Sequence, residues 1–344
     1  MTIGKEEILA LRRSLQNKTV GIAGDFCVDI YWEADMTRSE LSRETPHFPL
    51  PVTAERVYPG AGGNVAANLA ALQPKKVAAL TLAGDDWRGM LLKEKLRALK
   101  IDDALLVTVP GRFTNAYCKP IRHGISAVAY EDPRLDFDNF TPVDETVEAK
   151  IIENLTALAS ESDVLCVADQ FRFGCITPAV REALREIAKQ IPVIADSRYH
   201  IADFTGCILK PNEVECWRAV YGDDGFLTAS AEQFRSAAIT LARRNSATVF
   251  CTLGAEGSVL TDGVSVYDTP AVPVSGPVDI CGAGDTSLAA FACALAAGAV
   301  LVEAAAFAAY ASAVTVQKLG VTGTACFEEI LRLVCGEQAP ALRA

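Results

Sequence analysis

The chain has 344 residues, 50% of them hydrophobic, and a formal net charge of −11 at pH 7. A chain of this length and apolar content can bury a sizeable core, so we expect one large domain with a small addition. The acidic charge argues against a nucleic-acid partner, because DNA and RNA require a dense basic face.

The N-terminal and Ala-rich segments give no sign of a signal peptide or a membrane span. Residues 1–18 form a charged amphipathic helical pattern without the apolar core of a signal peptide. The run 286–313 contains Glu303 and small side chains, which favours a packed helix pair over a lipid-spanning helix. We therefore expect a cytoplasmic protein with no membrane partner.

Cysteine and histidine are distributed in a way that argues against metal and disulfide chemistry. None of the 11 cysteines forms a C-x₂-C or C-x₄-C pair, and several lie inside apolar runs, which is typical of buried reduced thiols. The three histidines supply little for a zinc site or a Ser-His-Asp triad.

Short apolar runs alternate with helical patterns along most of the chain. Strands are predicted at 18–24, 77–84, 163–169, 191–196, 206–210 and 247–254, and helices at 62–73, 86–99, 178–190 and 231–244. This alternation predicts an α/β fold with a central, mostly parallel sheet flanked by helices. Ligands of such sheets bind beyond the carboxyl ends of strands, where Asp25, Asp169 and Asp196 lie.

Two segments, 27–58 and 114–138, break this rhythm. They are richer in aromatic, β-branched and proline residues and lack a helical period. We expect them to form a small sheet inserted into a single domain that spans 1–344, where it could cover a ligand as a lid. Exposed edges and the side chains of Tyr31, Trp32 and Phe48 also predict a homodimer through this lid.

The segment "YPGAGGNVAANLAAL" (58–72) is the first of two Gly-rich elements. Gly60, Gly62 and Gly63 open a helix, and Asn64 near its start could cap the helix or hold a hydroxyl-rich ligand. The segment does not fit the G-x-G-x-x-G dinucleotide fingerprint, and the chain has no G-x-x-x-x-G-K-[ST] P-loop.

The second element is "VDICGAGDTSLAAFACALAAG" (278–298), in which Gly282-Ala283-Gly284-Asp285 precede a helix predicted from 287 to 297. The first N–H groups of a helix have no internal partner and lie at the positive end of its dipole, so this turn predicts an anion site. Asp285 would stand beside the anion as a proton acceptor. The alternative is that Asp285 only caps the helix.

Taken together, these residues resemble the ribokinase (PfkB) family of carbohydrate kinases. The resemblance rests on Asp25, "GAGGNVAANLA", "KPNEVE" (210–215), "TLGAEGSVL" (252–260), "DICGAGDT" (279–286) and "KLG" (318–320). It covers residues 18–330. Further segments, "GDFCVDIYWEA", "LSRETPHFPLPV", "KPIRHG" and "RLDF", are similar to the kinase domain of bacterial heptose 7-phosphate kinases. The nucleotidyltransferase half that some of those enzymes carry is not expected in this chain.

The resemblance implies a ribokinase-like fold and ATP-dependent phosphoryl transfer to a sugar or sugar phosphate. Asp285 would accept the proton of the hydroxyl, and the backbone of Gly282, Ala283 and Gly284 would stabilise the transferred group. The substrate side would use Asp25, Gly62, Gly63 and Asn64, and the nucleotide side Lys210, Asn212, Thr252, Gly254 and Gly257. Asn212 and Glu215 would organise Mg²⁺ through water, and Asp279 would lie near a monovalent cation such as K⁺.

Some of these assignments have alternatives. Asp25 could be a turn cap, and the Asn212–Glu215 pair could be a solvated helix start. Ile280 departs from the Thr often found there, which leaves the monovalent-cation site near Asp279 open. Ala309 replaces an Asn that often lies next to the adenine, so base selectivity could be relaxed.

A phosphorylated acceptor would need a local basic cluster on this acidic chain. The candidates are Arg43, Lys119, Arg122 and Arg134, which lie in or beside the lid segments. The alternative is that these are ordinary solvated charges. Other acceptors, such as ribose, fructose or a related keto-sugar, stay open, as does a catalytically silent sugar-binding regulator; a nicotinamide-dependent oxidoreductase lacks its fingerprint.

Overall fold

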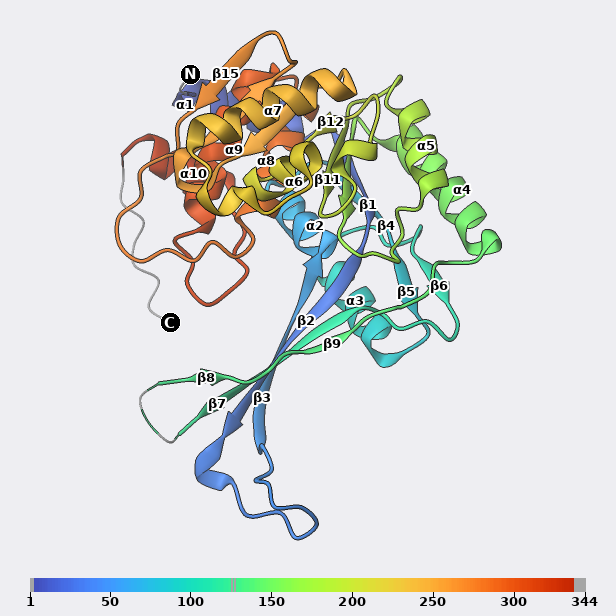
Figure 1. Ribbon diagram of the computed structural model, residues 1–344, viewed down its shortest axis with the longest axis vertical. Helices are drawn as coiled ribbons and strands as arrows, with labels where there is room; N and C mark the ends of the chain where they lie inside the picture. Colours follow the sequence, from blue (N-terminus) through green and yellow to red (C-terminus); the bar gives the residue numbers. More distant parts are fainter. Residues whose placement is uncertain (1–2, 125, 127, 337–344) are drawn as a thin grey trace.

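The computed structural model describes residues 3–124, 126 and 128–336 and has an eight-stranded sheet at its centre (Figure 1). The strands lie in the order β15 (Val266–Thr269), β14 (Ser258–Thr261), β13 (Val249–Thr252), β12 (Ile208–Leu209), β11 (Val193–Ser197), β10 (Val164–Asp169), β1 (Thr19–Gly24) and β4 (Lys76–Leu80). Neighbouring strands from β13 to β4 all pair in parallel. The β13–β14 and β14–β15 pairs are antiparallel. The predicted mostly parallel sheet is confirmed.

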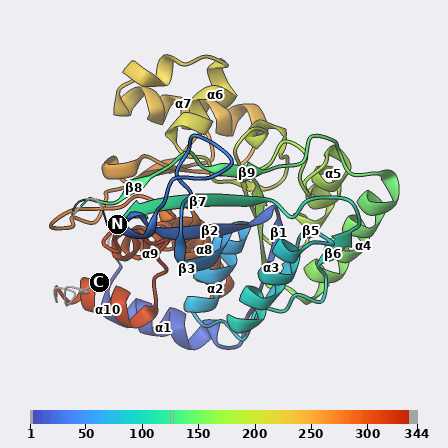
Figure 2. The ribbon, with the colours of Figure 1, turned by 90° about the horizontal axis from the view of Figure 1, so that it is seen from below.

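Helices cover both faces of this sheet, which explains why β10 and β11 are buried along their whole lengths. One face packs against α1 (Lys5–Leu15), α2 (Gly62–Ala71), α3 (Trp87–Ala98), α8 (Ala283–Ala296), α9 (Leu301–Thr315) and α10 (Phe327–Val334). The other packs against α4 (Glu145–Glu161), α5 (Pro178–Ile187), α6 (Glu213–Tyr221) and α7 (Ala231–Asn245). Figure 2 shows α6 and α7 on the side opposite to α1 and α10.

The Ala-rich run forms α8 and α9, which pack against each other as predicted. Their small side chains allow close approach, and the Phe291 ring of α8 stacks on Phe250 of β13 with centroids 4.4 Å apart. No helix in the described part of the chain is long and apolar enough to cross a bilayer. All 11 cysteines are unpaired thiols.

A second sheet extends away from this body (Figure 1). It contains β2 (Phe26–Asp35), β3 (Val52–Ala61), β7 (Ala116–His123), β8 (Tyr130–Glu131) and β9 (Leu135–Phe137). The segments 27–58 and 114–138 supply nearly all of it. At its base Phe26, Val28 and Ile30 join the hydrophobic core, while alternate residues of β2 point to the opposite face.

The predicted strand at 77–84 is wrong in one respect, because the chain changes sheets within it. Residues up to Leu80 pair with β1, whereas β5 (Leu82–Gly84) pairs with β6 (Val107–Val109). Thr81 lies at the break, where its hydroxyl accepts a hydrogen bond from the Phe26 N–H and its carbonyl accepts one from Val107 N–H.

Candidate active site

Asp285 lies in the first turn of α8, beyond the carboxyl ends of the central strands. The helix begins at Ala283, and its N-cap is Gly282, with φ +79°. A Cβ at Gly282 would lie 2.9 Å from Thr322 Cγ2, so both the conformation and the space favour glycine. Asp285 is therefore the third residue of the helix, and the alternative that it is the N-cap is wrong.

The backbone of this turn offers unpaired donors. Within the described residues, the N–H groups of Gly282, Gly284 and Asp285 have no backbone or side-chain acceptor. Gly284 and Asp285 belong to the start of the helix, where free N–H groups are expected. Ala283 differs, because its N–H donates to Ile280 O at 3.2 Å. The prediction that Ala283 contributes a free donor is therefore wrong, whereas the anion site itself is retained by its neighbours.

The Asp285 carboxylate is half-buried and accepts a hydrogen bond from Asn64 Nδ2 of α2. Desolvation is the main cause that raises the pKa of Asp285 to about 7; Asp196 also raises it, while Asn64 and Lys210 lower it. Asp285 can therefore exchange a proton near neutral pH. The predicted neighbours of the Gly-rich element, Gly62 and Gly63, bring Asn64 here by opening α2 against Phe26 and Pro59.

Lys210 brings a buried positive charge to this turn. Only 1% of its surface is exposed, and its Nζ donates to Asp196 Oδ2 at 2.7 Å. A Cβ at Gly284 would lie 3.8 Å from the same Nζ. Burial acts to lower the pKa of Lys210, but Asp196, Glu215 and Asp285 outweigh it and raise the pKa above its usual value, so the ammonium stays charged. The sequence predicts only that Asp196 lies at the carboxyl end of a strand, and the structure adds its ion pair with Lys210.

Asn212 and Glu215 form a capping box at the start of α6. Asn212 Oδ1 accepts from Glu215 N–H at 2.8 Å, and Glu215 Oε2 accepts from Asn212 N–H at 2.9 Å. The pair is half-buried rather than solvated. Desolvation and the charge of the neighbouring Asp196 raise the pKa of Glu215 to about 7.

These residues fit magnesium held through water better than magnesium held directly. Asp196 and Glu215 supply hard carboxylate oxygens, yet the described residues contain no group of three or more His, Cys, Asp or Glu able to hold a metal ion. Mg²⁺ commonly keeps several waters and takes few protein ligands beside phosphate oxygens.

The predicted nucleotide-side turn lies next to this helix start. Thr252 forms an isolated parallel bridge with Asn212, and its N–H donates to Pro211 O at 3.0 Å. Gly254 and Gly257 have φ of +56° and +93°, and a Cβ at Gly257 would lie 2.1 Å from Thr269 O. Beyond the turn, an apolar cavity lies between residues 269–273 and α9, and Ala309 lines it.

Asp279 organises the loop before α8. Its Oδ1 accepts from Cys281 N–H at 3.0 Å and its Oδ2 accepts from Gly320 N–H at 3.0 Å. The "DICGAGDT" and "KLG" segments are thus joined through one carboxylate.

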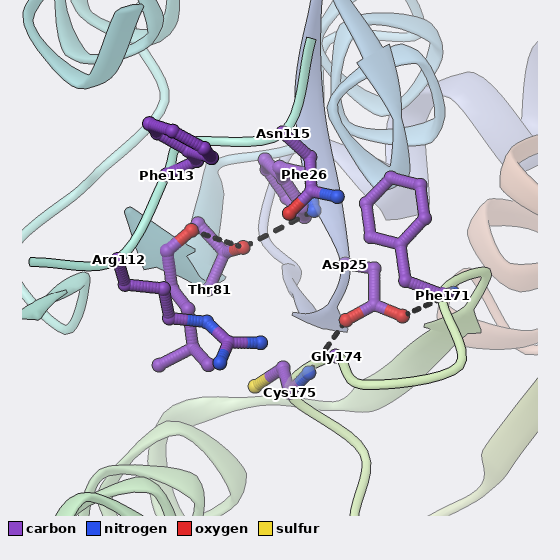
Figure 3. A pocket seen from close by; sticks show the side chains of 10 residues that line it. Asp25, Phe26, Thr81, Arg112, Phe113, Asn115, Phe171, Gly174 and Cys175 are labelled. Carbon is purple, nitrogen blue, oxygen red and sulfur yellow. Dashed lines mark hydrogen bonds between the residues drawn. The ribbon is translucent and has the colours of Figure 1, made fainter. Parts of the chain in front are cut away.

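The structure gives Asp25 a role different from the predicted sugar binding. It is 3% exposed, and its carboxylate accepts N–H bonds from Gln170 (2.9 Å), Phe171 (2.8 Å) and Cys175 (2.6 Å), as Figure 3 shows in part. Desolvation and the charge of Asp169 raise its pKa to about 7. Asp25 therefore holds the 170–175 loop, and both of its oxygens are engaged.

Asp29 is the acid that sequence reasoning missed. It lies on the face of β2 that also carries Cys27 and Tyr31, half-buried, and its negative charge raises the pKa of Asp285. Lys119 Nζ of β7 lies 3.8 Å from Asp29 Oδ1 and donates to the Tyr31 hydroxyl at 2.9 Å. The sequence signal for Asp29 was a second Asp four residues after Asp25 in "GDFCVD". Asp29 lies on β2, whereas Asp25 precedes the strand.

The four basic residues expected to bind a phosphate do not converge. Arg122 Nη2 pairs with Asp132 at 2.7 Å, and Arg134 makes two hydrogen bonds to Asp136, at 2.6 and 2.7 Å. Lys119 and Arg122 lie on opposite faces of β7, because successive odd and even positions alternate. Arg43 is exposed in the loop before β3. The predicted four-residue cluster is therefore wrong.

Residues 27–326 match the pfkB family of carbohydrate kinases. The chain belongs to this family. The bifunctional protein HldE of Hyphomonas neptunium is 32% identical over 309 residues, which cover 84% of this chain and 59% of HldE. That of Caulobacter vibrioides is 33% identical over 319 residues, covering 90% and 62%. The chain thus spans roughly three fifths of the length of these relatives.

Solved structures of two sugar kinases superimpose on most of the chain. Arabidopsis thaliana ribokinase, complexed with ribose and ATP, has a TM-score of 0.69 at 22% identity and covers 92% of this chain and 99% of its own. Phosphofructokinase-2 of Escherichia coli, in complex with potassium, has a TM-score of 0.71 at 20% identity, with 93% and 99% covered. The predicted ribokinase-like fold is confirmed.

Proposed function

We propose that this PfkB carbohydrate kinase transfers the γ-phosphoryl group of ATP to the anomeric hydroxyl of a heptose 7-phosphate. The observation that carries the kinase chemistry is Asp285, whose pKa is raised to about 7 beside three unpaired N–H groups and the buried Lys210. The heptose assignment rests on the lid motifs that resemble heptose 7-phosphate kinases.

The residues divide the chemistry among them. Asp285 accepts the proton of the acceptor hydroxyl as its oxygen attacks the γ-phosphorus, and Asn64 orients the carboxylate through its amide. The N–H groups of Gly284 and Asp285 and the Lys210 ammonium stabilise the charge that develops on the transferred phosphoryl oxygens. These donors are fixed before the substrate arrives, because Lys210 is buried and the N–H groups belong to a helix.

Asn212, Glu215 and Asp196 would hold Mg²⁺ through water. Bound there, the ion would offset the negative charge of the ATP phosphates. The proposal also includes K⁺ near Asp279, whose carboxylate orders the loop in front of the anion turn.

We assign the sugar hydroxyls to Asp29 and Asn64 under the lid, in place of Asp25. The negative charge of Asp29 acts on Asp285. Burial raises the pKa of Asp29, and the Lys119 ammonium beside it opposes this rise. The adenine would occupy the apolar cavity beside Ala309. Since this cavity supplies few polar side chains, several nucleoside triphosphates should serve as donors.

A screen for ADP release tests the function. Purified protein with Mg²⁺ and ATP is offered heptose 7-phosphate, free heptose, ribose, fructose and a keto-sugar acid. We expect release with heptose 7-phosphate. Faster turnover of an unphosphorylated sugar would leave only the general sugar-kinase assignment, and binding of sugar without any release would indicate a silent regulator.

The proposal extends to assembly and location. The far end of the lid exposes apolar side chains, among them Leu41 (63%), Phe48 (64%) and Val52 (51%), which supports a homodimer through the lid. Eleven unpaired thiols suit the reducing cytoplasm.

A further inference from the structure

Two arginines beside the site have no carboxylate partner. Within the described part of the chain, the side chains of Arg172 and Arg198 make no ion pair and no hydrogen bond to protein, although the chain carries a net charge of −11. Both side chains are exposed. Most arginines on this acidic molecule are paired, as Arg122 and Arg134 are, so these two are available to an external anion.

Their positions are set by the carboxyl ends of two neighbouring parallel strands. Arg198 directly follows β11, and its N–H donates to the carbonyl of Asp169, the last residue of β10, at 3.0 Å. Arg172 lies in the loop after β10 that Asp25 holds. The two loops meet, because the Arg172 Cζ lies 6.0 Å from the ring centroid of Tyr199. This edge is where ligands bind in open α/β sheets.

The two loops also face the lid. Phe171, next to Arg172, packs edge-on against Tyr117 of β7, with ring centroids 6.3 Å apart. Tyr117 is the register partner of Asp29, the acid proposed to bind the sugar. The positive charge of Arg198 acts both on the second sheet and on the start of α6. It opposes the burial that raises the pKa of Tyr117 on β7. It also opposes the burial and the Asp196 charge that raise the pKa of Glu215 on α6.

We infer that Arg172 and Arg198 bind the phosphate monoester that the acceptor carries before it is phosphorylated. A phosphate dianion suits two guanidinium groups, which can each donate a pair of hydrogen bonds to its oxygens. The inference rests on the proposed function in taking the acceptor to be a sugar phosphate. It replaces the cluster of Arg43, Lys119, Arg122 and Arg134. Three of these pair with carboxylates, and Arg43 lies at the far end of the lid, in the loop before β3.

Binding measurements test this assignment without relying on turnover. Isothermal titration calorimetry measures the Kd of heptose 7-phosphate, free heptose and the non-hydrolysable ATP analogue AMP-PNP with Mg²⁺, for the wild type, Arg172→Gln, Arg198→Gln and Arg198→Lys. Arg185→Gln is the matched control, since Arg185 pairs with Glu182 on the outer surface of α5. Circular dichroism checks that each variant is folded.

We expect each Gln variant to raise the Kd of heptose 7-phosphate about 10- to 100-fold, the loss typical of a charged hydrogen bond, and to leave heptose and AMP-PNP within about twofold. For Arg198→Lys, the Kd of heptose 7-phosphate should lie between those of the wild type and Arg198→Gln. Lysine keeps the positive charge but cannot donate the pair of parallel hydrogen bonds that a guanidinium group donates. The inference would be overturned if the Gln variants left the Kd of heptose 7-phosphate unchanged, or if they weakened the binding of AMP-PNP by the same factor. It would also be overturned if the wild type bound no heptose 7-phosphate.

The same experiment separates the inference from the function. Arginine-dependent binding of heptose 7-phosphate without phosphoryl transfer by the wild type would refute the proposed function and support the phosphate site. Transfer to heptose 7-phosphate with a KM unaffected by both Gln variants would support the function and refute the site.

Discussion

Burial raises the pKa of both Asp285 and Asp25 to about 7, but the two carboxylates have different partners. Asp285 lies in a Gly-Ala-Gly-Asp turn, which predicted an anion site because helix starts leave N–H groups unpaired, and the turn has three such groups. The position of Asp25 after the first strand likewise predicted that it binds the sugar. That pattern could not reveal that Gln170, Phe171 and Cys175, about 145 residues away in sequence, donate to Asp25, since only the folded loop brings them there.

Asp285→Asn keeps the shape of the side chain and removes the proton acceptor. We expect kcat to fall about 10²- to 10⁴-fold, with the Kd of AMP-PNP and the stability little changed. Because the pKa of Asp285 is raised to about 7, the wild-type kcat/KM should fall as pH drops below about 7, where the carboxylate is protonated, and level off above it. Steady-state rates from pH 5.5 to 9 check this. Near wild-type rates for Asp285→Asn would refute the role. Asp224→Asn is the control, because the Asp224 side chain is 71% exposed.

Glu215→Gln separates helix capping from magnesium. A Gln side chain can still accept the Asn212 N–H bond, so the free energy of unfolding should change little, whereas loss of the charge should raise the Mg²⁺ concentration needed for half-maximal rate. Rates measured over a Mg²⁺ series, with urea unfolding in parallel, test both. An unchanged Mg²⁺ requirement would leave Glu215 as a helix cap alone.

The contact between α2 and α8 positions Asn64 and Asp285. Thr286 Oγ1 donates to Asn68 Oδ1 at 2.8 Å and lies 3.0 Å from Thr315 Oγ1, and all three side chains are buried. A buried network of this kind is costly to break, because each polar atom left behind loses its partner.

Thr286→Val is nearly isosteric and removes the hydroxyl. It should lower the free energy of unfolding by about 1–3 kcal/mol and also lower kcat, because α2 and α8 lose a shared hydrogen bond. Urea unfolding checks the stability. Thr156→Val on the exposed face of α4 should stay within about 0.5 kcal/mol. Equal stability of the two variants would mean that the network does not hold the helices.

Helices and strands were predicted best where their pattern is long or their boundary residues are specific. The α2, α3, α5 and α7 helices lie close to their predicted ranges, and Pro178 and Ser230 mark two of the starts. The strand at 77–84 was predicted as one element because its residues are apolar throughout, and apolar runs do not record a change of sheet at Thr81.

The lid makes the molecule elongated (Figure 1). The loop between β2 and β3 at its far end exposes apolar side chains. Tyr31 and Trp32, expected to be exposed, have partners within the chain: Lys119 donates to the Tyr31 hydroxyl, and Trp32 Nε1 donates to Glu55. Phe48, which is 64% exposed, is a better candidate for a contact between subunits.

Light scattering after size exclusion tests the dimer. We expect the wild type to be a dimer at micromolar concentration and Phe48→Glu to be a monomer, since a charge would have to be buried without a partner. Val264→Glu is the control, because Val264 is 88% exposed on the turn between β14 and β15. A wild-type monomer would rule out the lid dimer.

The most direct test follows the transferred phosphoryl group by ³¹P nuclear magnetic resonance. Protein, Mg²⁺, ATP and heptose 7-phosphate are mixed, and the spectrum is recorded as ATP is consumed. We expect ADP together with a new phosphate resonance coupled to the anomeric proton. With Asp285→Asn, neither should appear on the same time scale. Consumption of ATP to inorganic phosphate, or no consumption in the presence of heptose 7-phosphate, would contradict the proposed function.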